Sequence, residues 1–140
     1  MTVRTIAMDY LSRREHSRHE LKKKLLARDF ALNDINAALD QLASENWQSD
    51  ARFSENYVHY RAASGFGPLR IIMELRARGV ADDMIDQHVN ANDAIWKERV
   101  IVVQKKKFLG STKSVEQQCR FLLHRGFSPE SVYSCCRAID

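Results

Sequence analysis

The chain has 140 residues, enough for one ordinary domain or for three stacked small repeats. Hydrophobic residues make up 44% of it, so it can bury a core, whereas its 5 glycines and 2 prolines are too few for a β-sandwich with many tight turns. The 22 basic and 18 acidic residues leave a net charge of +4, which permits a polyanionic partner without requiring one.

The N-terminal residues lead into no apolar segment of the secretory type, and the longest aliphatic run, residues 100–103, is far too short to span a membrane. We therefore expect a cytoplasmic protein without a membrane partner. The three cysteines should be reduced in that compartment, and no CxxC or Cys/His spacing indicates a metal site. We expect the cysteines to have structural roles.

One short pattern occurs three times: Leu-x-x-Arg, then Asp or Gly, then an apolar residue. It begins at Leu25, Leu75 and Leu122, at offsets of 50 residues (25 to 75) and 47 residues (75 to 122). Flanking apolar positions keep the same register: Ile35, Ile85 and Val132; Leu39, Val89 and Cys136; and, upstream, Val3, Phe53 and Val100. Tandem units of this kind form arrays, which usually bind rather than catalyse.

The elements of the first repeat read as three helices. Residues 3–13 place apolar side chains at helical spacing. A second helix follows the capping box Ser17-x-x-Glu20, with Leu25 and Leu26 in its apolar stripe. The third helix is expected to bury Ile35, Ala38, Leu39 and Leu42. Between the last two helices, Asp29 occupies the position that a glycine holds in the other repeats, and Asp tolerates the left-handed conformation expected there.

The second repeat should begin with Asp50 as an N-cap and should bury Phe53 and Tyr57. Its second helix starts at Pro68, which suits the first helical position, and its third helix starts at Asp82.

The third repeat runs from about residue 93. A weaker capping box, Ser114-x-x-Gln117, opens its second helix, and Ser128 followed by Pro129 opens the third. No segment alternates as a strand would. We predict an all-α chain of three tandem three-helix repeats, with limits at 1–49, 50–92 and 93–140.

The second helices are basic. Residues 17–28 carry five basic side chains and one acidic one (+4), residues 68–78 three and one (+2), and residues 114–125 two and one (+1). The third helices of the first two repeats are acidic instead. The basic faces are either ordinary solvated faces or a stripe that binds a partner. The candidate partner-binding residues are Arg18, Lys22, Lys23, Arg70, Arg76 and Arg120, with a separate cluster of Lys105, Lys106 and Lys107.

No catalytic or cofactor motif is present: the sequence contains no GxxxxGK[ST], GxGxxG, HExxH or GxSxG. His16 and His19 are three apart, but a catalytic zinc site needs a third ligand that the sequence does not indicate. We predict no catalytic, cofactor or metal residues and no enzyme activity. Among the aromatic residues, Trp47 and Trp96 should pack between repeats. Exposure of Phe66, in contrast, would indicate a ring on which a nucleic-acid base could stack.

Several of these segments together resemble the RecX family, bacterial regulators of the RecA recombinase. The matching segments are Ser12-Arg13-Arg14-Glu15-His16-Ser17, Glu20-Leu21, Lys24-Leu25, Asp50-x-Arg52-Phe53, Gly67-Pro68-x-Arg70-Ile71, Glu74-Leu75 and Phe121-Leu122-x-x-Arg125-Gly126-Phe127. They follow the expected order over nearly the whole length. Asp29 in place of the usual glycine is a small departure that concerns a turn.

The resemblance implies an elongated, curved array of three-helix repeats that binds in the deep groove of the RecA–DNA filament. It implies altered filament growth or stability, with suppressed strand exchange, ATP hydrolysis and co-protease activity. Recombination, DNA repair and the SOS response would then be modulated. The resemblance supplies no list of contact residues, so the candidates above rest on charge alone.

One alternative is a stand-alone, sequence-independent nucleic-acid-binding protein with DNA as its direct partner, because the chain is basic and three-helix units are similar to helix-turn-helix modules. The sequence shows no dedicated recognition helix and no sign of dimeric symmetry. We expect a monomer. A third interpretation is that the protein is an enzyme, and the absence of catalytic motifs disfavours it.

Overall fold

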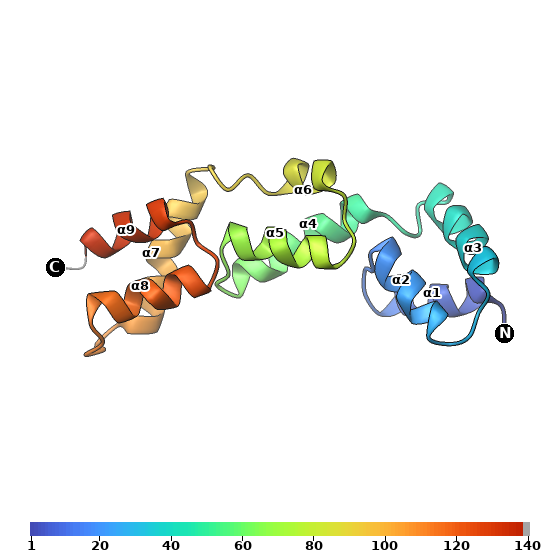
Figure 1. The fold of residues 1–140 in the computed structure, drawn as a ribbon, viewed down its shortest axis with the longest axis horizontal. Helices are drawn as coiled ribbons and strands as arrows, with labels where there is room; N and C mark the ends of the chain where they lie inside the picture. The colour runs from blue at the N-terminus through green and yellow to red at the C-terminus, as the bar shows by residue number, and fades with distance from the viewer. Residues whose placement is uncertain (139–140) are drawn as a thin grey trace. The chain divides into compact units, whose positions relative to one another are not determined.

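The computed structural model describes residues 1–138, and every regular element within that range is a helix (Figure 1). Nine helices occur among these residues: α1 (Val3–Arg13), α2 (Arg18–Leu26), α3 (Leu32–Ser44), α4 (Asp50–Ala63), α5 (Pro68–Ala77), α6 (Asp82–His88), α7 (Ile95–Phe108), α8 (Val115–His124) and α9 (Pro129–Arg137). The prediction of an all-α chain is confirmed, and the helices follow one another in the predicted groups of three.

The helices pack as two compact units. Unit 1 contains Met1–Tyr57 and Leu75–Ile85, and unit 2 contains Val58–Glu74 and the chain from Asp86 onward. The boundaries between the units fall inside α4, α5 and α6. For example, the beginning of α5 belongs to unit 2 and its end belongs to unit 1. The limits predicted for the three repeats, 1–49, 50–92 and 93–140, therefore stay a prediction.

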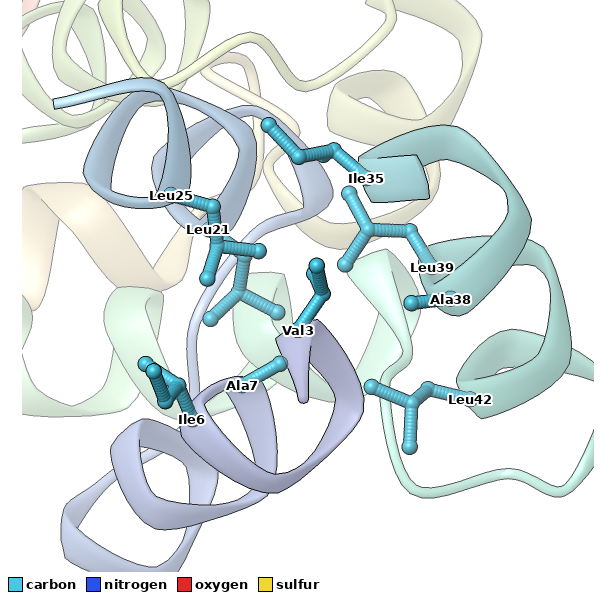
Figure 2. Close-up of a cluster of buried hydrophobic side chains, with 9 residues drawn as sticks. All are labelled: Val3, Ile6, Ala7, Leu21, Leu25, Ile35, Ala38, Leu39 and Leu42. Carbon is cyan, nitrogen blue, oxygen red and sulfur yellow. The ribbon is translucent and has the colours of Figure 1, made fainter. Parts of the chain in front are cut away.

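Unit 1 contains a core in which α1, α2 and α3 meet (Figure 2). The buried side chains that form it are Val3, Ile6, Ala7, Leu21, Leu25, Ile35, Ala38, Leu39 and Leu42. Tyr10 and Leu11, at the end of the apolar face of α1, pack at its edge. Each helix buries one stripe of aliphatic side chains, as the periodicity of the sequence predicts.

The repeated leucines are buried at equivalent positions: Leu25, Leu75 and Leu122 each have 0% of their surface exposed. The flanking residues of the repeat are buried as well: Ile35, Ile85 and Val132; Leu39, Val89 and Cys136; and Val3, Phe53 and Val100. The apolar positions that the sequence repeat aligns are therefore buried in all three repeats. Leu26 differs from the prediction, with 44% exposed, because it lies one residue beyond Leu25 and so about 100° further around the helix.

A left-handed turn follows the second helix of each group. Its central residue has a positive φ, 65° at Asp29, 78° at Gly79 and 96° at Gly126. In each turn the next amide donates to the carbonyl five residues earlier: Phe30 to Leu25 at 3.4 Å, Val80 to Leu75 at 3.2 Å and Phe127 to Leu122 at 3.4 Å. These bonds define a Schellman motif and confirm the predicted conformation of Asp29.

The predicted serine caps are confirmed. Ser17 and Ser114 form capping boxes with Glu20 and Gln117, and Ser128 caps α9 ahead of Pro129. These caps satisfy amide donors that the first turn of a helix leaves unpaired.

The prediction that Asp50 caps α4 is wrong. Ser49 is the residue whose hydroxyl accepts from an amide of the first turn, that of Arg52 at 3.1 Å, and the helix begins at Asp50. The Asp50 carboxylate instead accepts from the backbone amide of Arg18 at 2.9 Å and from the Gln48 side chain at 2.9 Å. Asp50 therefore satisfies the first amide of α2, from a position 32 residues further along the chain.

The two tryptophans differ. Trp96 is buried, with 4% exposed, and its indole N–H donates to the Asn90 carbonyl at 3.0 Å. Trp47, in the segment after α3, is 52% exposed, which is against the expectation that it packs between repeats. Tyr57 is half-buried and stacks on Phe53, with 5.6 Å between ring centroids.

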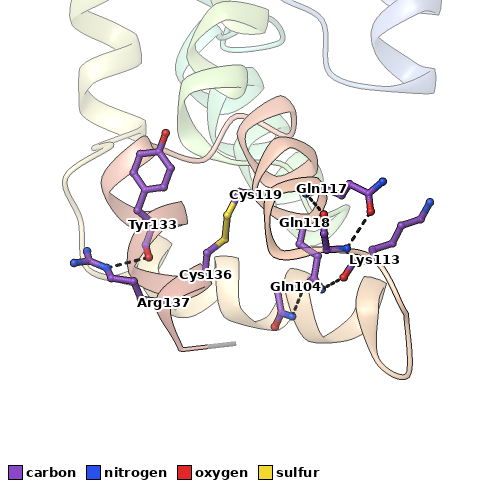
Figure 3. The surroundings of a disulfide bond; sticks show 9 residues. Gln104, Lys113, Gln117, Gln118, Cys119, Tyr133, Cys136 and Arg137 are labelled. Carbon is purple, nitrogen blue, oxygen red and sulfur yellow. Dashed lines mark hydrogen bonds between the residues drawn. A yellow bond between two sulfur atoms is a disulfide. The ribbon is translucent and has the colours of Figure 1, made fainter. Parts of the chain in front are cut away.

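The expectation of three reduced cysteines is also corrected, because Cys119 in α8 and Cys136 in α9 form a disulfide (Figure 3). The two helices pack so that these Cα atoms lie 6.4 Å apart, within the reach of such a bond. Their separation of 17 residues matches no short motif and gave no signal in the sequence. Cys135 is free and buried, and burial raises the pKa of its thiol.

Each unit contains the same kind of junction between a left-handed turn and the start of another helix. In unit 1 the turn after α5 lies against the start of α2, where the Ser17 hydroxyl donates to the Arg78 carbonyl at 2.7 Å. A Cβ added to Gly79 would overlap the side chain of His19. Glycine is therefore required there by close approach as well as by its φ.

In unit 2 the turn after α8 lies against the start of α5. The amide of Gly67 donates to the Arg125 carbonyl at 2.8 Å, and the amide of Leu69 donates to the Gly126 carbonyl at 2.9 Å. A Cβ added to Gly126 would come within 2.6 Å of the backbone nitrogen of Arg70. Gly67 is equivalent to Ser17 in the repeat, so a backbone amide takes the place of the serine hydroxyl at this junction.

Candidate partner-binding surfaces

The arginines that the charge pattern selected are largely neutralised within the chain. Three of them form ion pairs with nearby carboxylates: Arg18 with Asp40 at 2.7 Å, Arg76 with Asp82 at 2.8 Å and Arg70 with Glu74 at 3.3 Å. Asp40 and Asp82 belong to α3 and α6, the acidic third helices. The basic second helices and acidic third helices thus meet in local pairs, which reduces the charge that the arginines offer to a partner.

The candidate lysines and Arg120 differ from these three arginines because they have no ion-pair partner in the described part of the chain. The exposed residues of this group are Lys23, Lys105, Lys106, Lys107 and Arg120, and Lys22 is half-buried. Among residues 1–138, none of these six side chains forms an ion pair. Lys22 and Lys23 belong to unit 1, and the others belong to unit 2. A continuous stripe that joins the two groups stays a prediction.

Unit 2 has a surface pocket of about 560 Å³ formed by α7, α8 and the end of α4, which we call the basic pocket. Its cations are Arg99, Lys106, Lys107 and Arg125, with His59 beside them, and its apolar lining includes Ala62, Val102, Val103 and Phe121. No carboxylate from the described part of the chain lines it. The volume lies in the range of ligand sites in proteins.

The sequence named Lys106 and Lys107 but missed the other members of the basic pocket. Arg99, Val102, Val103 and Lys106 are spaced i, i+3, i+4 and i+7 and therefore share one face of α7. This spacing is visible in the sequence and predicts that the four side chains share a face. Arg125 comes from the end of α8, and no local pattern connects it with α7.

A smaller pocket of about 290 Å³ adjoins it through Lys107 and Phe121. Lys113 and Arg120 supply its remaining cations, and Phe108 supplies a second ring. The structure thus brings the predicted residue Arg120 together with Lys107. Lys105 lines neither pocket.

The aromatic rings near these cations are already engaged. Lys107 and Arg125 lie over the Phe121 ring, 5.2 and 4.9 Å from its centroid, and Phe108 contacts it edge to face at 5.3 Å. The ring stabilises neighbouring positive charges. Phe121 is therefore part of a packed cluster of rings and cations rather than a bare stacking platform.

Phe66 is also enclosed. The guanidinium groups of Arg61, Arg125 and Arg70 lie 3.7, 4.5 and 4.7 Å from its ring centroid. Arg61 is held by Glu74 through two hydrogen bonds of 2.9 Å each. The exposure that would have indicated base stacking is absent, because Phe66 is half-buried beneath these groups.

His16 is a buried structural residue, with 1% exposed. Its Nδ1 lies 3.0 Å from the Arg14 carbonyl, and its Nε2 lies 2.9 Å from Lys24 Nζ, which fits a neutral ring that donates through Nδ1 and accepts through Nε2. Burial lowers the pKa of His16, and the neighbouring cations Arg14 and Lys24 lower it further. Within residues 1–138, no cluster of three or more metal-ligating side chains is found.

No helix in the described part of the chain is long and apolar enough to cross a bilayer. The fold and its surfaces define a small all-helical protein of three-helix repeats with exposed cationic surfaces. Family models for RecX match two parts of the chain, the first three-helix domain over residues 4–42 and the second over residues 49–88. The chain belongs to the RecX family.

Relatives support this assignment over nearly the full length. Regulatory protein RecX of Pseudomonas putida strain KT2440 is 42% identical over 136 residues, covering 94% of this chain and 87% of that protein. Regulatory protein RecX of Pseudomonas entomophila strain L48 is 43% identical and covers 94% of this chain and 88% of that protein. The family is one of regulatory proteins.

The fold is similar to a solved structure of this family. The crystal structure of RecX from Lactobacillus salivarius matches with a TM-score of 0.82, covering 99% of this chain and 94% of that one. The sequences are 20% identical, so this likeness concerns the fold.

Proposed function

We propose that the protein regulates the RecA recombinase, mainly as an inhibitor, by binding in the groove of the RecA–DNA filament. Membership of a family of regulatory proteins, over 94% of the chain, is the observation that carries this proposal. Modulation of recombination, DNA repair and the SOS response would follow. The protein would act in the cytoplasm as a monomer.

Unpaired lysines support an electrostatic part in this binding. Lys22 and Lys23 on α2 have no ion-pair partner among residues 1–138, in contrast to Arg18 on the same helix. A recombinase filament contains DNA phosphates, which attract such cations and speed association. If phosphate contacts dominate, log affinity falls linearly with log salt, by about 0.7–0.9 for each phosphate that is neutralised.

The test measures RecA ATP hydrolysis on single-stranded DNA across a salt series. A double variant, Lys22→Glu with Lys23→Glu, should inhibit hydrolysis more weakly than the wild type. It should keep its fold, because neither lysine forms an ion pair within residues 1–138 and charges at the surface of a helix contribute little stability. A matched control reverses two exposed cations that are not candidate residues and form no ion pair within residues 1–138, Arg28→Glu with Arg137→Glu, and so changes the net charge by the same amount. Circular dichroism checks the fold of both.

Three results would count against the proposal or a part of it. Wild-type inhibition by the folded Lys22/Lys23 variant at every salt concentration would reject this part of the surface. Failure of the wild-type protein to alter RecA hydrolysis would reject the function itself. Binding to DNA alone, as tight as binding to the assembled filament, would favour a stand-alone nucleic-acid-binding protein instead.

A further inference from the structure

We infer that the basic pocket of unit 2 binds an acidic peptide segment that inserts an apolar side chain. The inference concerns the pocket itself and holds whichever protein presents the segment. All the residues that line the pocket belong to unit 2, on α7, on α8 with the residue that follows it, and on the end of α4 with the two residues that follow it. The site is therefore complete within one compact unit.

The rim of the pocket carries uncompensated positive charge. Lys106 and Lys107 are exposed and unpaired within residues 1–138, and Arg99 and Arg125 extend the same sign around the rim. The Arg125 guanidinium donates to the Ser64 carbonyl at 3.2 Å, a neutral acceptor that leaves its charge in place. Cations gathered around a concave surface attract a ligand with several negative charges.

The apolar lining of the pocket is mainly aliphatic. Val102 is 64% exposed, although it lies one turn before Lys106 on the same face of α7, and Val103 and Ala62 line the pocket next to it. An exposed valine that lines the same pocket as four cations has apolar surface that a ligand can remove from water. The ligand must therefore be apolar at its centre and negative around that centre.

A peptide meets both requirements better than a nucleic acid does. Phosphates would pair with the cations, but a base needs a free aromatic face on which to stack. The aromatic ring of this pocket, Phe121, already lies under Lys107 and Arg125, and Phe108 contacts it. A leucine or phenylalanine side chain packs on aliphatic groups without such a face, and flanking Asp or Glu residues reach the rim.

The test uses fluorescence anisotropy with a labelled synthetic peptide in which Asp and Glu alternate with Leu and Phe. A second peptide keeps every acidic residue and replaces each Leu and Phe by Ser. A labelled oligothymidine of similar charge is the third probe. The first peptide should bind at least roughly tenfold more tightly than the second, because one or two apolar side chains are buried.

Substitutions on α7 locate the site. Val102→Ser should weaken binding of the first peptide roughly tenfold, and Lys106→Gln roughly fivefold. Matched controls on the same helix, Ile101→Ser and Lys105→Gln, replace exposed residues that do not line the pocket, and they should change affinity less than about twofold. Val102 is exposed, so its replacement should leave the fold intact, which circular dichroism verifies.

Three outcomes would overturn the inference. The two peptides could bind equally well, with Val102→Ser without effect, which would indicate general attraction to positive charge. Oligothymidine could bind most tightly and be weakened by Lys106→Gln but not by Val102→Ser, which would indicate a nucleic-acid site. The acidic peptide with Leu and Phe could fail to bind at all. None of these measurements involves the recombinase, so they are independent of the function proposed above.

Discussion

Gly67→Ala should destabilise unit 2, for a reason that differs from the usual one for glycine. Gly65, Gly79, Gly110 and Gly126 have positive φ, and Gly67 is the remaining one of the 5 glycines. Backbone conformation therefore does not require glycine at position 67. Close approach does, since a Cβ there would come within 2.6 Å of the Gly126 carbonyl oxygen.

The magnitude follows from the junction between the start of α5 and the turn after α8. Relieving such an overlap by moving backbone costs about 1–3 kcal/mol. The movement also stretches the bonds from Gly67 to Arg125 and from Leu69 to Gly126, 2.8 and 2.9 Å long, each worth about 0.5–1.5 kcal/mol. Because movement that relieves the overlap weakens the bonds, we expect a total of about 2–4 kcal/mol.

Urea denaturation measures this cost, and amide hydrogen exchange at Gly67 and Leu69 locates it. The control is Gly110→Ala. Gly110 has φ of 71° but nothing within 4 Å of an added Cβ, so its cost should be only about 1–2 kcal/mol of left-handed strain. The reasoning is refuted if Gly67→Ala costs no more than Gly110→Ala, or if both amides keep their wild-type protection.

Three further predictions concern stability. Leu75→Ala should cost about 2–5 kcal/mol and be the least tolerated of the three repeated leucine truncations; a urea midpoint almost unchanged from wild type would show that the register is misread. Asp29→Gly should stabilise by about 0.5–1 kcal/mol, because glycine relieves the strain of φ 65°, and a lower thermal midpoint would contradict this. The pKa of His16 is lower in the folded state than in the unfolded chain, so the unfolded chain binds a proton first as the pH falls. The free energy of unfolding should therefore not depend on His16 above about pH 6.5 and should decrease on acidification below that pH. His16→Gln should reduce that decrease in urea titrations, and an identical acid dependence would exclude His16 as its source.

The features that were predicted from the sequence depend on short-range patterns. Burial of Leu25, Leu75 and Leu122 follows from helical periodicity, and the turn at Asp29 follows from its place in the repeat. Asp50 is a residue for which reasoning from neighbouring residues gives the wrong hydrogen-bond partner. A carboxylate at a helix start looks locally like a cap, but its amide partner is Arg18, 32 residues away, and only the fold brings them together.

The candidate binding surfaces were predicted only in part, for the same reason. A charge count along one helix cannot detect that Arg18 pairs with Asp40, which is 22 residues away on another helix. The lysines at 106 and 107 were found because consecutive charges are visible in any sequence. The exposed Val102, one turn before Lys106 on α7, was not found, because an aliphatic residue in an apolar run is ordinarily expected to be buried.

The left-handed turns after α2, α5 and α8 differ in what can come close to them. Gly79 and Gly126 let another helix start come close to their turns, and a side chain at either position would collide with it. The equivalent turn at Asp29 is exposed to solvent, and its central residue carries a Cβ and a charge. A helix start could therefore not pack against this turn as closely as α2 and α5 pack against the other two, so the three turns that the repeat aligns are not interchangeable.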